Sequence, residues 1–434
     1  LIGAFGSKVA VQPDKYTMTR RAVWSHARFQ LGVGLLFAVA LPWTIRVNLH
    51  VAELEWPGLQ NSLAGTTFAL IAGYFGYRRL SRYPGVRASF YILPTFAASY
   101  GLVLAIFFFS RLDYSRLHFS VSFLLCIFWY YIVYFNLQRR RLRIGFIPAG
   151  ETERVTAIAD VQWVDLSADP AAAADLDLIV ADLRADLGED WERFLADRAL
   201  EGRLVMHVKQ MEESLTGRVA IEHLSENTFG SLIPAIVYAR VKRIGDFVAA
   251  VIATPLLAPF LLLIGLAIRL DSRGSVFFLQ ERMGYRGAPF RMIKFRTMKA
   301  DTDPDPDPRR AAMTGAEDLR VTRVGRFLRR YRLDELPQVF NVLRGEMSWI
   351  GPRPEAIPLS KWYEAELPFY RYRHIVRPGI TGWAQLKQGH VAEVDEVLEK
   401  LHYDFYYIKN FSFWLDLLIL AGTIRIMVSG YGAR

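Results

Sequence analysis

The stretch FVAAVIATPLLAPFLLLIGLAI, residues 247–268, contains no charged side chain and is long enough to cross the hydrocarbon core of a membrane as a helix. Both of its flanks are basic: Arg240, Lys242 and Arg243 precede it, and Arg269, Arg273 and Arg282 follow it. Basic residues gather on the cytoplasmic side of membrane proteins, so a helix that crossed once would leave one cluster on the wrong side. We therefore expect both ends of this stretch on the same side of the membrane.

Two prolines, Pro255 and Pro259, lie near the middle of this stretch. Proline removes a backbone donor and collides with the preceding turn, which bends a helix sharply. Each half would rise by about 16 Å, roughly half a hydrocarbon core. We therefore predict a re-entrant helix over about 244–270 that enters one leaflet, breaks at the prolines and returns. An ordinary span kinked by proline is the alternative.

Four further uncharged windows precede this stretch, at residues 29–45, 56–77, 88–110 and 117–138. They predict an N-terminal domain, residues 1–141, built as a bundle of four transmembrane helices; buried helices of a soluble core are the alternative. Lysine and arginine gather in the N-terminal tail, in the loop between the second and third windows, and after the fourth window. The positive-inside rule places these segments, and everything that follows them, in the cytoplasm.

The distribution of charge also bears on partners and metals. The chain has 434 residues, a formal net charge of +10 and a single cysteine, Cys126. Because the excess of basic residues follows the predicted topology, we expect no nucleic-acid partner. The lone cysteine excludes a disulfide framework and a cysteine-based metal site, and the eight histidines show no spacing of metal ligands.

Residues 142–239 alternate short runs rich in β-formers with polar runs that favour helices. Candidate strands are 143–147, 161–166, 176–180 and 204–208, which predict a small α/β, Rossmann-like module with a parallel sheet. Its first turn, GFIPAGE from Gly145, lacks the GxGxxG spacing that closes backbone amides on a pyrophosphate. We therefore favour a structural module, and a candidate for pairing subunits in a homo-oligomer, over a nucleotide site.

Several unusual strings lie close together after residue 240. They are KRIGDF (from Lys242), FFLQERMGYRGAPF (277–290), KFRTM (294–298), RVTRVGRFLRRYRLDELPQVFNVLRGEMSWIGPRPE (320–355), RPGITGWAQL (377–386) and YDFYYIKN (from Tyr403). In this order and spacing they resemble the bacterial sugar transferase family, the monotopic phosphoglycosyl transferases. Residues 1–239 resemble the additional domains of its large members. The resemblance implies a mostly α-helical catalytic domain over 240–434, with the re-entrant helix and interfacial helices.

The resemblance also implies an activity. The family transfers hexose-1-phosphate from a UDP-hexose to undecaprenyl phosphate, releases UMP and uses Mg²⁺, in two displacements through a covalent aspartyl intermediate. This reaction starts the assembly of exopolysaccharide, capsule or O-antigen at the cytoplasmic face of the bacterial inner membrane. Glucose or galactose is the favoured hexose, and acetamido sugars stay open.

The family's functional positions transfer to this chain motif by motif. The dyad of its DELPQ motif corresponds to Asp334 and Glu335. Its substrate-binding cations correspond to Lys294, Arg296, Arg329 and Arg353, and its YDxxY element, to which we assign a structural role, to Tyr403, Asp404 and Tyr407. Pro259, with Pro255 before it, corresponds to the break in the re-entrant helix. Two departures are Ala258, where small members have serine, and residues 387–390, Lys-Gln-Gly-His, after RPGITGWAQL.

The chemistry of these residues agrees with this assignment. An ionised Asp334, favoured by a helix N-terminus and by neighbouring arginines, can attack phosphorus as a nucleophile. Glu335 is suited to holding magnesium through its carboxylate. The alternative is that both residues merely cap a helix among compensating arginines.

Two other functions remain open at this stage. One is a catalytically silent membrane scaffold that binds a nucleotide sugar. The other is a polytopic transferase that uses metal directly, with residues 247–268 spanning the membrane. Two further segments have less specific interpretations: the alternating acids Asp301, Asp303, Asp305 and Asp307 predict a mobile loop, and 411–428 predicts a helix at the membrane surface.

Overall fold

The computed structural model describes residues 24–48 except 25, 56–138 except 82 and 84–87, 143–221 except 159, 160, 169 and 177, 234–299, 307, 309, 320–388 and 394–429. Asp301, Asp303 and Asp305, and with them the predicted acidic loop, lie outside these residues apart from Asp307. The chain divides into two compact units, Leu1–Met211 and Glu212–Arg434. The predicted domain boundaries at 141 and 239 stay predictions.

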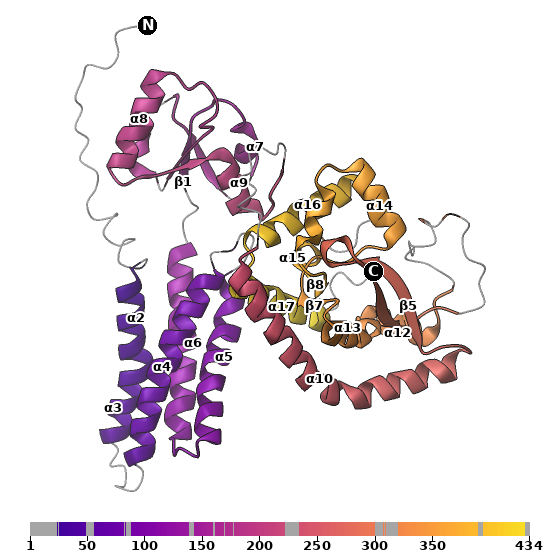
Figure 1. The fold of residues 1–434 in the computed structure, drawn as a ribbon. Coiled ribbons are helices and arrows are strands. Elements are labelled where there is room, and N and C mark those ends of the chain that lie inside the picture. Colours follow the sequence, from indigo (N-terminus) through magenta and orange to yellow (C-terminus); the bar gives the residue numbers. More distant parts are fainter. Residues whose placement is uncertain are drawn as a thin grey trace. The chain divides into compact units, whose positions relative to one another are not determined.

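The first unit begins with a bundle of long helices. These are α2 (Ala27–Leu35), the π-helical turn η1 (Leu36–Ala40), α3 (Leu41–Asn48), α4 (Trp56–Leu80), α5 (Ser89–Phe109) and α6 (Arg116–Gln138). Figure 1 shows them running side by side. The core between them is aromatic: the rings of Phe96 and Tyr130 stack with centroids 4.5 Å apart. Large apolar side chains such as Phe108 and Phe109 are exposed on the outside, as expected of a surface that faces lipid.

Three of the four predicted spans are long and apolar enough to cross a membrane, namely Ala27–Asn48, Ser89–Phe109 and Arg116–Leu137. The second window forms α4, which is 25 residues long but is not among the helices that meet this criterion. The physical reason is that α4 packs its small and polar residues inward. Ser62 and Thr66 are fully buried, and Gly65 lies directly against Phe107 of α5.

The first unit continues with a four-stranded parallel sheet, as the sequence predicts. Its strands are β1 (Arg143–Phe146), β2 (Gln162–Asp165), β3 (Leu178–Ala181) and β4 (Leu204–His207), in the order β2-β1-β3-β4. The connecting helices are α7 (Glu153–Thr156), η3 (Pro170–Asp175) and α8 (Glu189–Leu200), and α9 (Val208–Thr216) follows β4.

The turn after β1 is occupied by a carboxylate of the chain itself. The backbone N–H of Glu151 donates to Asp182 Oδ2 at 3.0 Å, and Gly150, with φ +61°, lies against the same carboxylate. In a nucleotide-binding module, amides of this turn would face a phosphate. This contact favours the structural interpretation of the module.

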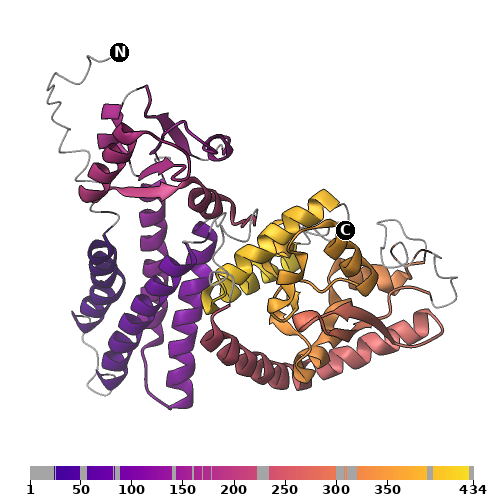
Figure 2. The ribbon, with the colours of Figure 1, turned by 45° about the horizontal axis from the view of Figure 1, so that its top comes forward.

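The second unit contains the 36-residue helix α10 (Ile236–Asp271), which begins earlier than the predicted residue 244. Pro255 and Pro259 both lie inside it, and Figures 1 and 2 show it bent in its middle. Thr254 Oγ1 donates to the carbonyl of Ala250 at 2.7 Å beside the bend. Helix α10 is long and apolar enough to cross a membrane, and only 6% of its most apolar stretch is buried inside the protein.

The rest of the second unit surrounds a β-hairpin. The hairpin consists of β5 (Phe277–Met283), η5 (Tyr285–Gly287) and β6 (Pro289–Phe295). After it come α12 (Arg323–Arg330), η6 (Leu333–Gln338), α13 (Val339–Arg344), β7 (Ser348–Ile350), α14 (Ile357–Glu366), η7 (Tyr370–Ile375), β8 (Gly379–Thr381), α15 (Trp383–Lys387), α16 (Val394–Lys409) and α17 (Phe413–Ser429). Strands β7 and β8 pair in parallel. The unit is mostly helical, as predicted.

Buried polar contacts join α10 to α17 and β7. Asp416 of α17 lies 2.7 Å from Lys242 Nζ and accepts the hydroxyl of Tyr407 at 2.8 Å. Asp246 of α10 accepts the hydroxyl of Ser348 at 2.6 Å. Asp416, which lies within the predicted surface helix 411–428, therefore faces the protein interior and forms its ion pair there.

Candidate active site

Asp334 and Glu335 lie in η6, directly after a sharp change in the direction of the chain. Thr322 caps the N-terminus of α12, because its hydroxyl accepts a hydrogen bond from the N–H of Gly325 at 2.9 Å. Two residues after α12 ends, Arg332 adopts φ +54°, a conformation uncommon for residues other than glycine. The chain then passes through Pro337 into α13. The dyad therefore lies in a short 3₁₀ turn between two helices.

Glu335 is buried and held by cations. Its Oε1 accepts a hydrogen bond from Arg353 Nη2 at 2.8 Å and lies 3.9 Å from Lys294 Nζ. Burial alone would raise the pKa of Glu335, but Arg353 and Lys294 outweigh it and lower the pKa to about 2. Glu335 is therefore a fixed carboxylate at any physiological pH.

Asp334 differs from its neighbour because its carboxylate is half-buried and, in the part of the chain that the structure describes, takes part in no hydrogen bond or ion pair. Burial and the charge of Glu335 raise its pKa, while Lys294, Arg353 and Arg329 act in the opposite direction. From the sequence we expected the surrounding cations to keep Asp334 ionised, without allowing for burial or for the charge of Glu335. The dyad therefore combines a carboxyl group without a hydrogen-bond or ion-pair partner, Asp334, with an ion-paired one, Glu335.

Two of the predicted cations approach the dyad from the hairpin and from α12. Lys294 lies on β6 with its side chain 14% exposed, and burial together with Arg353 lowers its pKa to about 8 in spite of Glu335. Arg329, in the last turn of α12, donates from Nε to Thr297 Oγ1 at 2.9 Å. Both side chains lie close enough to lower the pKa of Asp334.

Arg353 is the third predicted cation that lies beside the dyad. It follows β7 between Pro352 and Pro354, and proline fixes the backbone on both sides of it. Glu335, lying against the guanidinium, raises the pKa of Arg353 above its usual value. A planar guanidinium on a stiff loop is suited to binding a diphosphate.

Arg296 is the predicted site residue that the structure directs elsewhere. Its Nη2 donates to the carbonyl and hydroxyl oxygens of Ser272, at 2.8 and 2.9 Å, directly after α10. It therefore ties the hairpin to the end of the membrane helix, and a contact with substrate stays a prediction.

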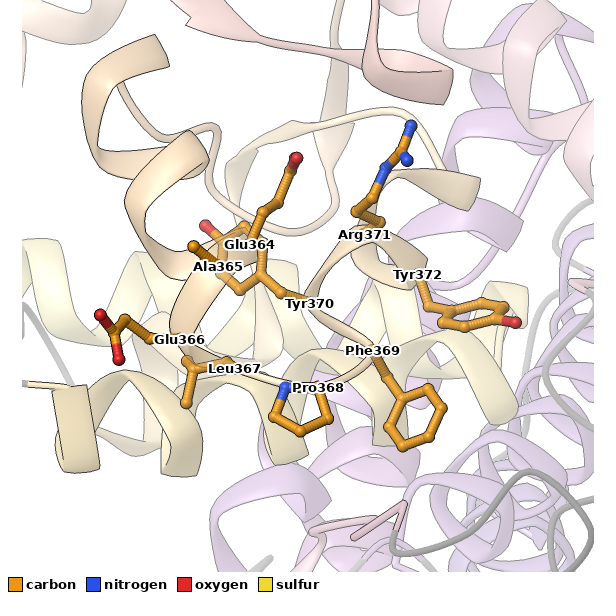
Figure 3. A pocket seen from close by; sticks show the side chains of 9 residues that line it. All are labelled: Glu364, Ala365, Glu366, Leu367, Pro368, Phe369, Tyr370, Arg371 and Tyr372. Carbon is orange, nitrogen blue, oxygen red and sulfur yellow. The ribbon is translucent and has the colours of Figure 1, made fainter.

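A pocket of about 360 Å³ lies on a different loop, between α14 and η7 (Figure 3). It is lined by consecutive residues, Glu364–Tyr372, with Phe369 in a left-handed conformation at φ +63°. None of the predicted site residues lines it.

Comparison with known proteins shows the family of this chain. The family model of the bacterial sugar transferases matches residues 237–430. A UDP-N-acetylgalactosamine-undecaprenyl-phosphate N-acetylgalactosaminephosphotransferase of Aeromonas hydrophila is 44% identical over 93% of this chain and 95% of its own. This chain belongs to the bacterial sugar transferase family. A UDP-glucose:undecaprenyl-phosphate glucose-1-phosphate transferase of Caulobacter vibrioides is 44% identical to this sugar transferase over 46% of the chain and 74% of its own.

The donor groups of the transferase fit a magnesium ion that is held mainly by substrate. Among the described residues, no group of three or more His, Cys, Asp or Glu side chains could hold a metal by itself. Mg²⁺ commonly takes one or two carboxylates and completes its shell with phosphates and water. Glu335 meets this need, because both of its contacts use Oε1 and neither uses Oε2.

Sequence reasoning gave Asp404 a structural role but did not predict that it belongs to a cluster of paired charges behind the Pro-Arg-Pro loop of the transferase. The cluster consists of the buried Glu355, Arg373, Lys400 and Asp404, together with Arg282, whose side chain is 12% exposed. A signal was present for four of them, because Arg282, Glu355 and Asp404 stand inside the quoted strings and Arg373 just before RPGITGWAQL. Charged residues are usually expected at the protein surface. Only the fold shows that these residues are paired in the interior.

Proposed function

We propose that this transferase moves a hexose-1-phosphate from a UDP-hexose to undecaprenyl phosphate and releases UMP, the initiating step of a bacterial polysaccharide. The observation that carries the proposal is the pair of unlike carboxyl groups: Glu335 is clamped by Arg353 and Lys294, while Asp334 beside it is unbound. Phosphoryl transfer requires this combination of a nucleophile and neutralised phosphate oxygens.

The reaction proceeds in two displacements. The Asp334 carboxylate attacks the phosphorus that carries the sugar, the bond to the bridging oxygen breaks, and UMP leaves with its electron pair. The phosphate oxygen of undecaprenyl phosphate then attacks the same phosphorus, which frees Asp334 and forms the lipid diphosphate. Lys294, Arg329 and Arg353 offset the negative charge in both steps. Mg²⁺, for which Glu335 is the proposed ligand, would supply further neutralisation of the diphosphate charge.

Two kinds of hexose are candidates for transfer. The Aeromonas hydrophila relative, which matches over 93% of this chain, is named for N-acetylgalactosamine, whereas the glucose transferase of Caulobacter vibrioides matches over 46% of the chain. We therefore place UDP-N-acetylgalactosamine first among the donors to test, ahead of the glucose and galactose donors favoured by the sequence.

Release of UMP by the purified full-length protein tests the proposed function. With undecaprenyl phosphate and Mg²⁺ present, we expect UMP from one UDP-hexose of a panel that includes the N-acetylgalactosamine, glucose and galactose donors. A protein that binds a donor but releases no UMP from any of them would be the silent scaffold instead.

The proposal extends to the membrane. The bent, apolar α10 supports a re-entrant helix that holds the dyad at the headgroup level of the cytoplasmic leaflet of the inner membrane. Interfacial placement of α17 and pairing of subunits through the α/β module belong to the same proposal.

Labelling from the two sides of the membrane tests the re-entrant helix. Arg240 and Arg273 flank the apolar part of α10 and are both exposed, so a cysteine at either position can react. In a chain whose buried Cys126 is replaced by alanine, we expect a membrane-impermeant thiol reagent to reach both positions only from the cytoplasmic side. Labelling from opposite sides would make α10 an ordinary span.

A further inference from the structure

A second arginine, Arg373, forms a hydrogen bond with the main chain of Arg353. Arg373, in η7, donates from Nη2 to the carbonyl oxygen of Arg353 at 2.8 Å. The same nitrogen lies 2.8 Å from Asp404 Oδ2, which also accepts from Nε at 3.1 Å, and Nη1 donates to the hydroxyl of Tyr370 at 2.7 Å. All three nitrogens of this guanidinium are therefore committed within the protein.

Arg373 is not placed to touch substrate. It is 3% exposed, and Asp404 on α16 is 1% exposed. The space between Arg373, Arg353 and His374 measures about 10 Å³, roughly the room of one water molecule. An effect of Arg373 on the reaction therefore has to pass through another residue.

The carbonyl of the next residue, Pro354, also accepts a hydrogen bond from a guanidinium group. Arg282 on β5 donates from Nη1 to the carbonyl oxygen of Pro354 at 2.7 Å. Glu355, the next residue, forms a buried ion pair with Lys400 of α16. Guanidinium groups thus hold two consecutive carbonyls of a loop whose prolines already restrict it.

We propose that Arg373 is a positioning residue: held by Asp404, it fixes the main chain of Arg353 and thereby the direction from which the Arg353 guanidinium meets Glu335 and the substrate diphosphate. The proposal rests on the proposed function. It requires the planar fork of arginine, because one guanidinium reaches the carbonyl, the carboxylate and the hydroxyl at fixed angles. A lysine in its place keeps the charge that neutralises Asp404 but loses this geometry.

Arg373→Lys is the test. Because displacement of a group by about 1 Å can cost about 100-fold in rate, we expect kcat to fall by about 100-fold and KM for the UDP-hexose to rise by about tenfold.

A merely structural role predicts something else, namely fewer folded molecules with unchanged KM and unchanged kcat per folded molecule. The amount of folded protein is therefore measured by thermal unfolding in the same preparations. Should Arg373→Lys fail to fold, Tyr370→Phe removes one contact of the guanidinium without changing charge, and it should change kcat and KM in the same direction but less.

The matched control is Glu399→Gln, also on α16, which removes an exposed ion pair with Arg218 and should change neither kcat nor KM. Unaltered kcat and KM in folded Arg373→Lys or, failing that, in folded Tyr370→Phe would overturn the positioning role. Absence of UMP release by the unmodified enzyme would instead overturn the proposed function.

Discussion

Replacing Asp334 by asparagine is expected to abolish turnover and the covalent sugar-phosphate adduct together. The amide has nearly the same shape and keeps the local fold, but it has no anion with which to attack phosphorus. Loss of a catalytic nucleophile costs at least about 10⁴-fold in kcat, equivalent to roughly 5.5 kcal/mol of barrier. UMP release and transfer of label from a donor labelled in its sugar-linked phosphate measure the two effects.

Asp395→Asn provides the matched control for this substitution. Asp395 lies exposed in the first turn of α16, so the same change of atoms there should leave both readouts unaltered. A labelled adduct that persisted in Asp334→Asn would place the nucleophile elsewhere. Substantial turnover without any adduct would favour direct attack by the lipid phosphate.

Glu335→Gln has the second largest expected effect, because it removes the carboxylate that Arg353 and Lys294 share. Arg353 and Lys294 would then face each other without their carboxylate. Breaking a buried ion pair by removing one partner costs about 3–5 kcal/mol, so we expect a lower unfolding temperature as well as a drop of about 10³-fold in kcat/KM. The pKa of Lys294, already about 8, should fall further.

The same variant tests the proposed magnesium ligand. A glutamine oxygen binds Mg²⁺ more weakly than a carboxylate, so residual activity should saturate only at higher magnesium concentration. An unchanged magnesium titration would show that Glu335 acts only by holding Arg353 and Lys294. Glu281→Gln, on β5 and exposed, is the control for the loss of one negative charge.

Local patterns in the sequence were enough for several parts of the fold. Alternating runs located all four strands of the parallel sheet to within two residues, because strand formation there follows short-range side-chain preferences. Uncharged windows located the long helices. They overestimated how apolar α4 is, since a count of charges does not register buried Ser62, Thr66 and the close-packed glycines.

The candidate site divides in the same way. The structure brings the predicted dyad together with Lys294, Arg329 and Arg353, and it places Arg296 against Ser272; the roles of these residues stay predictions. The raised pKa of Asp334 was missed because desolvation depends on neighbours that are distant in the sequence. The partnership of Arg373 with Asp404, 31 residues later, was missed for the same reason.

The amino-acid sequence by itself determined the membrane character, the helical and strand segments, and the residue types available for phosphoryl transfer, because these follow from local composition and spacing. Only the tertiary structure decided which carboxyl group is clamped and which is unbound, and which arginine holds the other in place. Those properties arise from burial and from distances between side chains far apart in the chain, and an electrostatic interaction depends on both.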